Sequence, residues 1–375
     1  MSAISSSFFT PLKKIWDLDL STLVGSKQLL GLDIGSSGIK IVQIKESKGR
    51  LRLQKFGIMP LSPDVIVDGT VMDSSKVVAA IKDLVREHGV KLKKAALSIS
   101  GHSVIVKKIS LPVMPEDELE IQVRLAAEQY IPFDINEVNL DFHILNPMES
   151  SDDGGATMSL LLVAAKKEKV VELSELVLAA GLEPAVLDVD AFAIENMYDV
   201  NYETGQEELV ALVNVGASVM NVNILKGGTS VFTRDISLGG NRYTEALQRK
   251  MGLNYLEAEE VKRTHQREGF EEDVVLSVLE DVNAEVASEI ARSVDYFRTT
   301  SLEREIQKIV LCGGSAQVAG LAQQLSDRMG LEVEMADPFR HIDVSGLGLD
   351  PDQLIETAPL AAVGVGLALR TLGDR

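Results

Sequence analysis

The sequence of 375 residues contains a single cysteine, Cys312, and no long hydrophobic run. One cysteine cannot form a disulfide within the chain, and this suits a reducing compartment. No stretch approaches the roughly 18 apolar residues that a transmembrane helix needs. Near the start, Pro11, Lys13 and Lys14 interrupt what would be the apolar core of a signal peptide. We therefore expect a cytoplasmic protein that is soluble or at most peripheral to a membrane.

Positive charge is also scarce, because 37 lysines and arginines stand against 56 acidic residues and leave a net charge of −19. Such a chain repels nucleic acid, and no local basic patch is evident, so we expect no nucleic-acid partner. The histidines lack the spacing of metal ligands and are expected to be structural or surface residues. They are His88, His102, His143, His265 and His341. The remaining composition is that of a globular protein large enough for two domains.

Residues 29–44, LLGLDIGSSGIKIVQI, predict a strand, a turn and a second strand. Asp33 closes the first strand and offers a carboxylate for a hydrated metal. The backbone amides of Gly35, Ser36 and Ser37 are free to face phosphate oxygens. The element after the turn is a strand and the spacing is not that of a Walker motif, so neither a P-loop nor a Rossmann site fits.

The same pattern occurs again in residues 211–225, ALVNVGASVMNVNIL, where Gly216 matches Gly35 and Ser218 matches Ser37. Ala217 lies between them in the turn, and Asn214 takes the place of Asp33. Two such hairpins indicate a duplicated fold that holds a nucleotide between its halves.

With these two motifs, the sequence resembles the actin-like ATPase superfamily, and within it the PilM family of type IV pilus assembly proteins, relatives of the cell-division protein FtsA. The resemblance extends over residues 29–370. It implies an α/β, duplicated actin-like ATPase fold of two domains with an inserted α+β subdomain of the 1C type. It also implies ATP and Mg²⁺ as ligands.

The resemblance divides the chain into an N-terminal tail, two domains and the inserted subdomain. Residues 28–93, 184–208 and 355–375 are expected in domain 1A, 94–183 in the 1C-type subdomain, and 209–354 in domain 2, with its 2B part at about 241–305. Residues 1–27 are expected to be a mobile tail, or to bind a membrane interface or a partner through Phe8, Phe9 and Trp16.

The long amphipathic helix predicted over residues 274–297 carries its buried stripe every four residues or so. Core packing accounts for this stripe completely. It consists of Val274, Val278, Val282, Val286, Ile290, Val294 and Phe297.

The resemblance also implies roles for the site residues. Asp33 and Asn214 would face the metal. Asp190 would orient water near the terminal phosphate, with Asp188 as the second choice, although an aspartate there could equally cap the following helix. The remaining cofactor contacts would be Gly35, Ser36, Ser37, Lys40, Gly216, Ala217, Ser218, Gly239, Gly240, Glu259, Lys262, Arg263, Gly313, Gly314 and Ser315.

Among these contacts, Glu259, Lys262 and Arg263 would reach the ribose and adenine, and the turn of residues 313–315 would be the adenosine motif. Ion pairing between residues three and four apart on an exposed helix explains the first three equally well. The glycine pair alone is also typical of an ordinary strand-to-helix turn.

Relatives that hydrolyse ATP usually carry an aspartate in both phosphate motifs, whereas here the second has Asn214, and Lys40 of the first hairpin becomes Asn221. An amide lacks the charge that holds a cation, so we expect slow hydrolysis or none.

The partner implied by the resemblance is the cytoplasmic N-terminal tail of the inner-membrane protein PilN, bound in a groove between 1A and 1C. The chain would thus lie on the inner face of the inner membrane, contact PilO, PilC and the motor ATPases indirectly, and form a homo-oligomer or ring. The alternatives are an FtsA-like filament-forming protein and a sugar or acid kinase, which would use Asp188 or Asp190 as the catalytic aspartate that faces the substrate hydroxyl.

Overall fold

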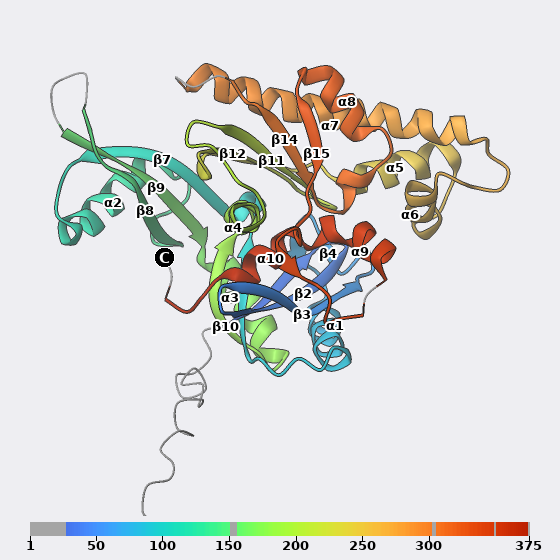
Figure 1. Ribbon diagram of the computed structural model, residues 1–375, viewed down its shortest axis with the longest axis horizontal. Helices are drawn as coiled ribbons and strands as arrows, with labels where there is room; N and C mark the ends of the chain where they lie inside the picture. The colour runs from blue at the N-terminus through green and yellow to red at the C-terminus, as the bar shows by residue number, and fades with distance from the viewer. Residues whose placement is uncertain (1–27, 151–155, 302–304, 349, 374–375) are drawn as a thin grey trace, which may run out of the picture.

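The computed structural model describes residues 28–150, 156–301, 305–348 and 350–373. The expectations about residues 1–27 therefore lie outside the described residues. Within them the chain forms two large sheets, a smaller sheet with its own helix, and helices that cover and join the sheets (Figure 1).

The first sheet has six strands in the order β10-β6-β1-β2-β3-β16. The strands β1, β2 and β3 form an antiparallel meander, and β6 and β10 continue the sheet in parallel with β1. The bounds are β1 Leu30–Gly35, β2 Gly38–Ser47, β3 Arg50–Pro60, β6 Lys94–Ile99, β10 Glu183–Val189 and β16 Ile342–Asp343. A short hairpin, β4 Ile66–Val67 and β5 Thr70–Val71, follows β3.

The second sheet repeats this arrangement with five strands in the order β13-β12-β11-β14-β15. Its bounds are β11 Leu209–Val215, β12 Met220–Lys226, β13 Thr229–Ile236, β14 Lys308–Cys312 and β15 Glu332–Met335. Asp33 faces Lys40 across β1 and β2, and Asn214 faces Asn221 across β11 and β12. This equivalent register confirms the predicted duplication.

Helices form three layers around the two sheets. Helices α1 Ser74–Glu87 and α3 Lys167–Ala179 cover the outer face of the first sheet. Helices α4 Asp190–Asn201 and α10 Ala362–Leu369 lie between the sheets, and α5 Gly240–Met251, α6 Tyr255–Thr264, α7 Glu272–Thr300 and α8 Leu321–Met329 cover the second sheet from outside (Figure 1).

Both faces of the second sheet are therefore buried, which explains the unbroken apolar run of β11. Ala211, Val213 and Val215 pack toward α5, α7 and α8, while Val210 and Leu212 pack toward α4 and α10. Strands covered on both faces read as continuous apolar runs. The two domains are consequently joined by a single apolar layer.

The inserted subdomain is smaller than expected. Strands β7 Val104–Pro112, β8 Val138–Ser150 and β9 Ala156–Lys166 form a separate sheet, and α2 Glu116–Tyr130 packs on it around a core of its own. The expected range 94–183 also included β6 and α3. However, β6 lies inside the first sheet and α3 packs beside α1, so both belong to domain 1A.

A similar correction applies to the end of domain 2. The range 209–354 included β16, which pairs with β3 at the edge of the first sheet. In α7, Val274 is 47% exposed, whereas Val275 is fully buried. Positions four apart advance by about 40° on a helix of 3.6 residues per turn, so the predicted stripe leaves the buried face at its first residue.

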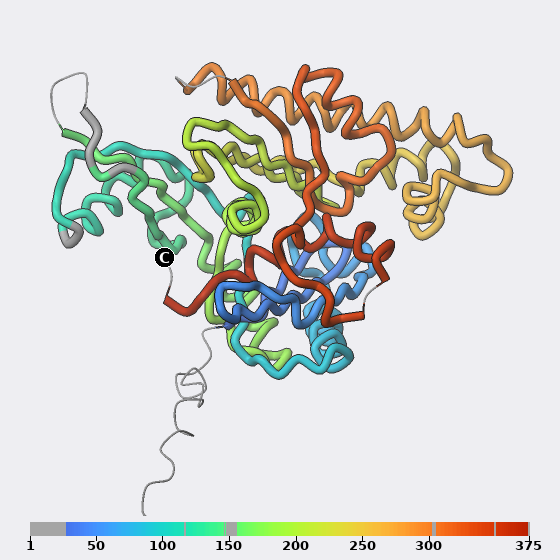
Figure 2. The backbone as a smooth tube through the Cα atoms, in the orientation of Figure 1, coloured from blue at the N-terminus to red at the C-terminus, as the bar shows by residue number. Residues whose placement is uncertain are grey.

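The chain passes twice between the domains, through α4 and through the segment that ends in α10 (Figure 2). Pro351–Leu369, which includes α9 Pro351–Thr357, is the one helical stretch in the described residues that is long and apolar enough to cross a membrane, although 56% of it is buried in the protein. Its last part is buried against β1, β2 and α4, as expected for a core helix. Tight helix packing is possible there because Gly366 lies directly over the backbone of Ala193.

Helix α4 also buries an acid whose ionisation should influence stability. Burial raises the pKa of Glu195 to about 7 from an ordinary 4.5. Folding therefore favours the protonated form of Glu195. Its contribution to the unfolding free energy is fully present below pH 4.5 and is lost as the pH rises through 7. Once ionised, the Glu195 side chain should lower the unfolding free energy by roughly 3 kcal/mol.

We expect Glu195→Gln to remove the part of the decline in unfolding free energy between pH 5 and 8 that this acid causes. Urea unfolding at several pH values would measure it. The control Glu203→Gln replaces an exposed glutamate and should follow the wild type. Equal pH dependence in all three proteins would show that Glu195 does not titrate in this range.

Candidate functional site

A cavity of about 820 Å³ lies between the two domains, where the strands of both sheets end. It is lined by the turns of both hairpins, the β10–α4 junction and the turn after β14. The predicted residues that line it are Asp33, Gly35, Ser36, Ser37, Lys40, Asp190, Asn214, Gly216, Ala217, Ser218, Gly313, Gly314 and Ser315. The fold thus brings together four predicted segments that are far apart in the sequence.

An ion pair defines the first hairpin. Lys40 Nζ lies 3.1 Å from Asp33 Oδ2, and each side chain is only 14% exposed. A side chain at Gly35 would come within 3.1 Å of Lys40 Nζ, so this glycine leaves room for the ammonium group over the turn. A carboxylate and an ammonium group consequently stand beside the turn amides, which suits a metal–phosphate ligand.

Amides replace the ion pair in the second hairpin. Asn214 Nδ2 donates to Asn221 Oδ1 at 2.8 Å, and Asn221 Nδ2 donates to Asp235 Oδ1 at 2.8 Å. Asn214 Oδ1 lies 3.9 Å from the buried Cys312 Sγ. The Asn214 amide is therefore engaged at both ends, and it offers no charge to a cation.

The turn after β14 packs closely on the second hairpin. Gly313 has φ +88°, and a Cβ there would lie 2.4 Å from Asn214 Oδ1 and 2.5 Å from the Val215 carbonyl oxygen. Only glycine fits this combination of backbone angle and space. Ser315 Oγ donates to the Gly216 carbonyl at 3.1 Å, which ties the turn to the second hairpin.

The structure separates the two candidate catalytic acids. Asp190 lines the cavity, and burial followed by the nearby Asp33 charge raises its pKa to about 6, against hydrogen bonds from Ser98 and Ser100 that lower it. It does not cap α4, because the N-cap residue is Val189 and no side chain caps the helix. Asp188 does not line the cavity, and its Oδ2 accepts from Arg370 Nη1 at 3.0 Å.

We expect Asp188→Asn to lower the unfolding free energy by about 2–3 kcal/mol, because removing one member of a buried ion pair leaves a poorly solvated charge. The Asp188 side chain is 5% exposed and that of Arg370 is 19% exposed. Chemical denaturation would measure the loss, and ligand binding by the folded variant should be unchanged. An equally stable variant would contradict this structural role.

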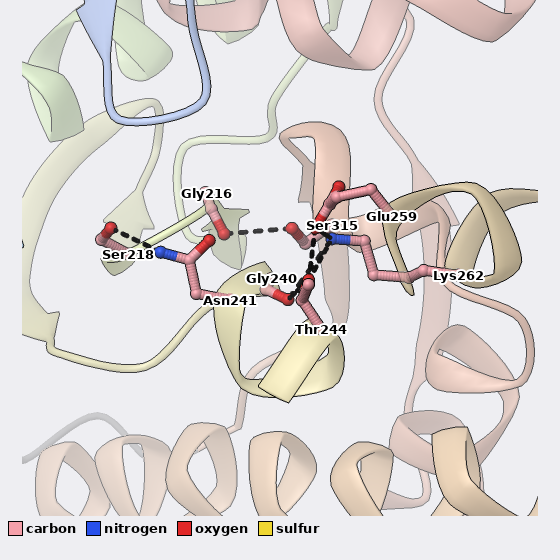
Figure 3. A network of polar contacts seen from close by, with 8 residues as sticks. All are labelled: Gly216, Ser218, Gly240, Asn241, Thr244, Glu259, Lys262 and Ser315. Carbon is pink, nitrogen blue, oxygen red and sulfur yellow. Dashed lines mark hydrogen bonds and ion pairs between the residues drawn. The ribbon is translucent and has the colours of Figure 1, made fainter. Parts of the chain in front are cut away.

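Three of the predicted contacts, Gly240, Glu259 and Lys262, belong to a polar network beside the cavity instead of lining it (Figure 3). Lys262 Nζ lies 2.6 Å from Glu259 Oε1 and 3.4 Å from the Gly240 carbonyl oxygen, and burial lowers the lysine pKa. Gly240 adjoins Ser315, because a Cβ on it would meet Ser315 Oγ. For Glu259 and Lys262 the structure thus shows the alternative interpretation, an ion pair between residues three apart on one helix. Gly239 packs against Ala217. Arg263 is exposed and outside the network.

Sequence reasoning missed the wall of the cavity that domain 1A and β9 provide. Ser98 lies near the end of β6 and Ser100 directly follows this strand. Lys166 ends β9, and Lys169 on α3 donates to the Gly69 carbonyl at 2.7 Å. The small polar residues in SISGHS, at the carboxyl end of an apolar strand, were the available signal. Lys166 and Lys169 gave no such signal in the sequence, because their approach to the cavity depends on how α3 packs.

A second cavity, a groove also of about 820 Å³, lies beside the first. Val104–Lys107 of β7, residues 128–133 at the end of α2, and Thr233–Asp235 of β13 line it, with Val189 and Ala191 at its base. Strands β7 and β13 are each the edge strand of their sheet in the part of the chain that the structure describes. The groove thus has a largely apolar wall from β7 and the end of α2, a polar wall from β13, and strand edges able to bind another backbone.

The residues present fit magnesium only as part of a nucleotide complex. In the described ranges no group of three or more histidine, cysteine or acidic side chains could hold a metal ion alone. Mg²⁺ is commonly held by one or two carboxylates together with phosphates and water. Asp33 provides such a carboxylate, whereas Asn214 does not.

The repeated sheets, the two cavity-lining hairpins and the paired helices between the domains define an actin-like fold. The sequence profile described as "Type IV pilus assembly protein PilM" matches residues 31–372. The chain belongs to this family.

Solved structures and curated relatives agree with this placement. The chain resembles a structure titled "PilM-PilN type IV pilus biogenesis complex" with a TM-score of 0.81 and 32% identity, over 92% of this chain and 99% of that one. It also resembles ethanolamine utilization protein EutJ from Carboxydothermus hydrogenoformans in fold, with a TM-score of 0.55 and 16% identity, over 91% and 89% of the two chains. Cell division protein FtsA of Streptococcus pneumoniae is 22% identical over 82% of this chain and 75% of its own length, and that of Bacillus subtilis is 20% identical over 82% and 78%.

Proposed function

We propose that the protein is a nucleotide-binding adaptor of type IV pilus assembly that docks the cytoplasmic tail of PilN. The observation that supports it most is the pair of adjacent cavities, one between the phosphate-type hairpins and one between two strand edges. The first suits a charged ligand of nucleotide size, and the second suits an extended peptide.

In this proposal ATP binds with its phosphates between the two hairpins. Backbone amides of the turns and Lys40 would hold phosphate oxygens, and Asp33 would hold Mg²⁺. The metal supplies charge neutralisation at the phosphates. For the adenosine, Glu259 and Lys262 would exchange their contact with each other, and Ser315 its hydrogen bond to the Gly216 carbonyl, for contacts with the ligand.

Hydrolysis in this site is proposed to be slow or absent. Asp190, which lines the cavity, would orient a water, but the second hairpin offers the neutral Asn214, which is hydrogen-bonded to Asn221. Phosphoryl transfer depends on neutralising charge and positioning the attacking water. With one charged hairpin, ATP serves mainly to hold the domains together.

The PilN tail is proposed to lie in the groove as an extended, mainly apolar segment that adds its backbone to β7 or β13. Val104, Ile105 and Val106 of β7, together with Tyr130 and Phe133, provide apolar surface. An edge strand offers main-chain hydrogen bonds for affinity, and side-chain pockets select the sequence. Through PilN the protein would be held at the cytoplasmic face of the inner membrane, in indirect contact with PilO, PilC and the motor ATPases.

Replacing Tyr130 tests the groove. Tyr130 is 42% exposed and lines the groove, so Tyr130→Ala should weaken binding of a synthetic PilN tail peptide by about tenfold, as loss of a buried interface tyrosine does. Isothermal titration would measure the affinity. Ile121→Ala is the matched control, since Ile121 lies on the same helix, is 64% exposed and does not line the groove. Equal affinities for all three proteins would place the tail elsewhere.

A further inference from the structure

Strand β8 of the inserted subdomain leaves one of its sides open. It lies at the edge of the sheet β7-β9-β8, where β9 pairs with it on one side and no described strand pairs with it on the other (Figure 1). Residues 138–144 are its regular part, because the pairing with β9 becomes irregular between Ile144 and Asn146. This regular part presents an unpaired strand edge.

The backbone groups on the open side belong to the even-numbered residues. The Lys167 N–H donates to the Glu137 carbonyl, so the odd-numbered residue before β8 turns its backbone toward the β9 side. Alternate residues of an antiparallel strand point their N–H and C=O groups to opposite sides. Phe142 agrees with this pattern, because its N–H donates to the side chain of Asp141 at 2.9 Å. Phe142 and its even-numbered neighbours thus offer hydrogen-bonding groups to a further strand.

The side chains of residues 138–144 alternate between two faces of the sheet. Leu140, Phe142 and Ile144 pack against the core of the inserted subdomain and are partly buried. Those on the opposite face are exposed, and they are Asn139, Asp141 and His143. The open edge therefore carries apolar side chains on one face, and a carboxylate and an imidazole two positions apart on the other.

This segment also lacks the residues that usually protect a free strand edge. Proteins commonly block such edges with lysine, proline or a bulge. Residues 138–144, VNLDFHI, contain neither lysine nor proline. Pro147 and the irregularity after Ile144 come only beyond them. The open edge is therefore suited to the addition of another strand.

A second, antiparallel copy of β8 complements this edge in one register. With Phe142 on the two-fold axis, Asp141 of each copy lies opposite His143 of the other, in the type of pair whose side chains come closest. Opposite charges and donor–acceptor pairs across two strands are stabilising, whereas like charges are destabilising. An axis at Asp141 would place two carboxylates opposite each other, and an axis at His143 would pair Asp141 with Leu145. The charge pattern thus selects the axis at Phe142.

We propose that two copies of this chain associate through β8 and join their inserted subdomains into one continuous sheet. Phe142 of each copy exchanges backbone hydrogen bonds with Phe142 of the other, as its outward N–H and C=O groups allow. Leu140 of each copy lies opposite Ile144 of the other, so the apolar layer continues across the junction. Asp141 exchanges its contact with its own strand for His143 of the second copy.

This association leaves the groove free. Strand β7, which lines the groove, is the opposite edge of the same sheet. If the groove holds the PilN tail as proposed, the dimer carries two tails at once. The association itself does not depend on the nucleotide or on the peptide.

The proposal is tested by sedimentation velocity of the full-length protein over a wide range of concentrations. We expect a reversible equilibrium between monomer and dimer. Asp141→Lys places a lysine opposite His143, and His143→Asp places two aspartates opposite each other, so each variant alone should dimerise at least about tenfold more weakly. An equimolar mixture of the two variants should regain the dimer, because the new lysine then faces the new aspartate and the remaining histidine faces the remaining aspartate.

Lys108→Asp is the matched control. Lys108 is exposed on β7, the other edge strand of the sheet, and lines neither cavity, so this variant should dimerise like the wild type. Wild type that stays monomeric at every concentration would overturn the proposal. A dimer that both single variants retain would place the contact elsewhere and overturn it as well. A mixture no more dimeric than its components would show that Asp141 and His143 do not face each other.

Discussion

Asp33→Ala should abolish the thermal stabilisation that magnesium ATP gives to the nucleotide-stripped protein. For the wild type, a ligand at a hundred times its dissociation constant adds about 2.7 kcal/mol, or several degrees in the midpoint of unfolding. Asp33 is the cavity carboxylate suited to the metal, and it also holds Lys40 in place at 3.1 Å. Its removal takes away a metal contact and lets the ammonium group move.

Because the substitution also breaks an ion pair, the quantity to compare is the shift caused by ATP and not the midpoint itself. Asp64→Ala is the matched control, since this aspartate pairs with Lys76 on the same domain, is 67% exposed and does not line the cavity. It should keep the full shift. A shift in Asp33→Ala equal to that of the wild type would show that the first hairpin does not hold the metal–phosphate group.

Gly366→Ala should destabilise the protein by about 3 kcal/mol or more. The added Cβ would lie 1.6 Å from the carbonyl oxygen of Ala193, so α10 and α4 must move apart. Overpacking of a rigid core typically costs 1–3 kcal/mol, about the upper end or beyond when the obstacle is backbone. These helices form the layer between the two sheets, so the change affects both domains.

Urea unfolding would measure this loss as a lower midpoint. Gly346→Ala is the control, because a Cβ there would meet nothing within 4 Å and the backbone angle does not require glycine. A midpoint of Gly366→Ala that matches the control would mean that α4 and α10 are not packed this closely.

The fold and the phosphate hairpins could be predicted because their signals are local. Alternating apolar residues and a Gly-Ser turn specify each hairpin, and the equivalent pairs Asp33–Lys40 and Asn214–Asn221 follow from the repeat. The assignment of β6 to the inserted subdomain was wrong because a strand's sequence does not state which sheet it joins. That choice is made by contacts distant in sequence.

The contacts of the residues around the cavity could not be predicted from the sequence. A Glu259–Lys262 pair at this spacing fits both a ligand contact and an ion pair, and only the structure shows the ion pair. The role of Asp188 became clear only through Arg370, which is 182 residues away. The resemblance implied a peptide groove between 1A and 1C, and the groove that we propose for this peptide is also lined by β13 of the second domain.

The most direct test of the account is to follow one equivalent of magnesium ATP on the nucleotide-stripped protein and to measure both binding and phosphate release. We expect ATP to bind and to be recovered largely intact, with phosphate released more slowly than ATP dissociates. Rapid phosphate release that Asp190→Asn abolishes would contradict the account and make the protein an ATPase. Failure of the wild type to bind ATP would contradict the nucleotide site itself.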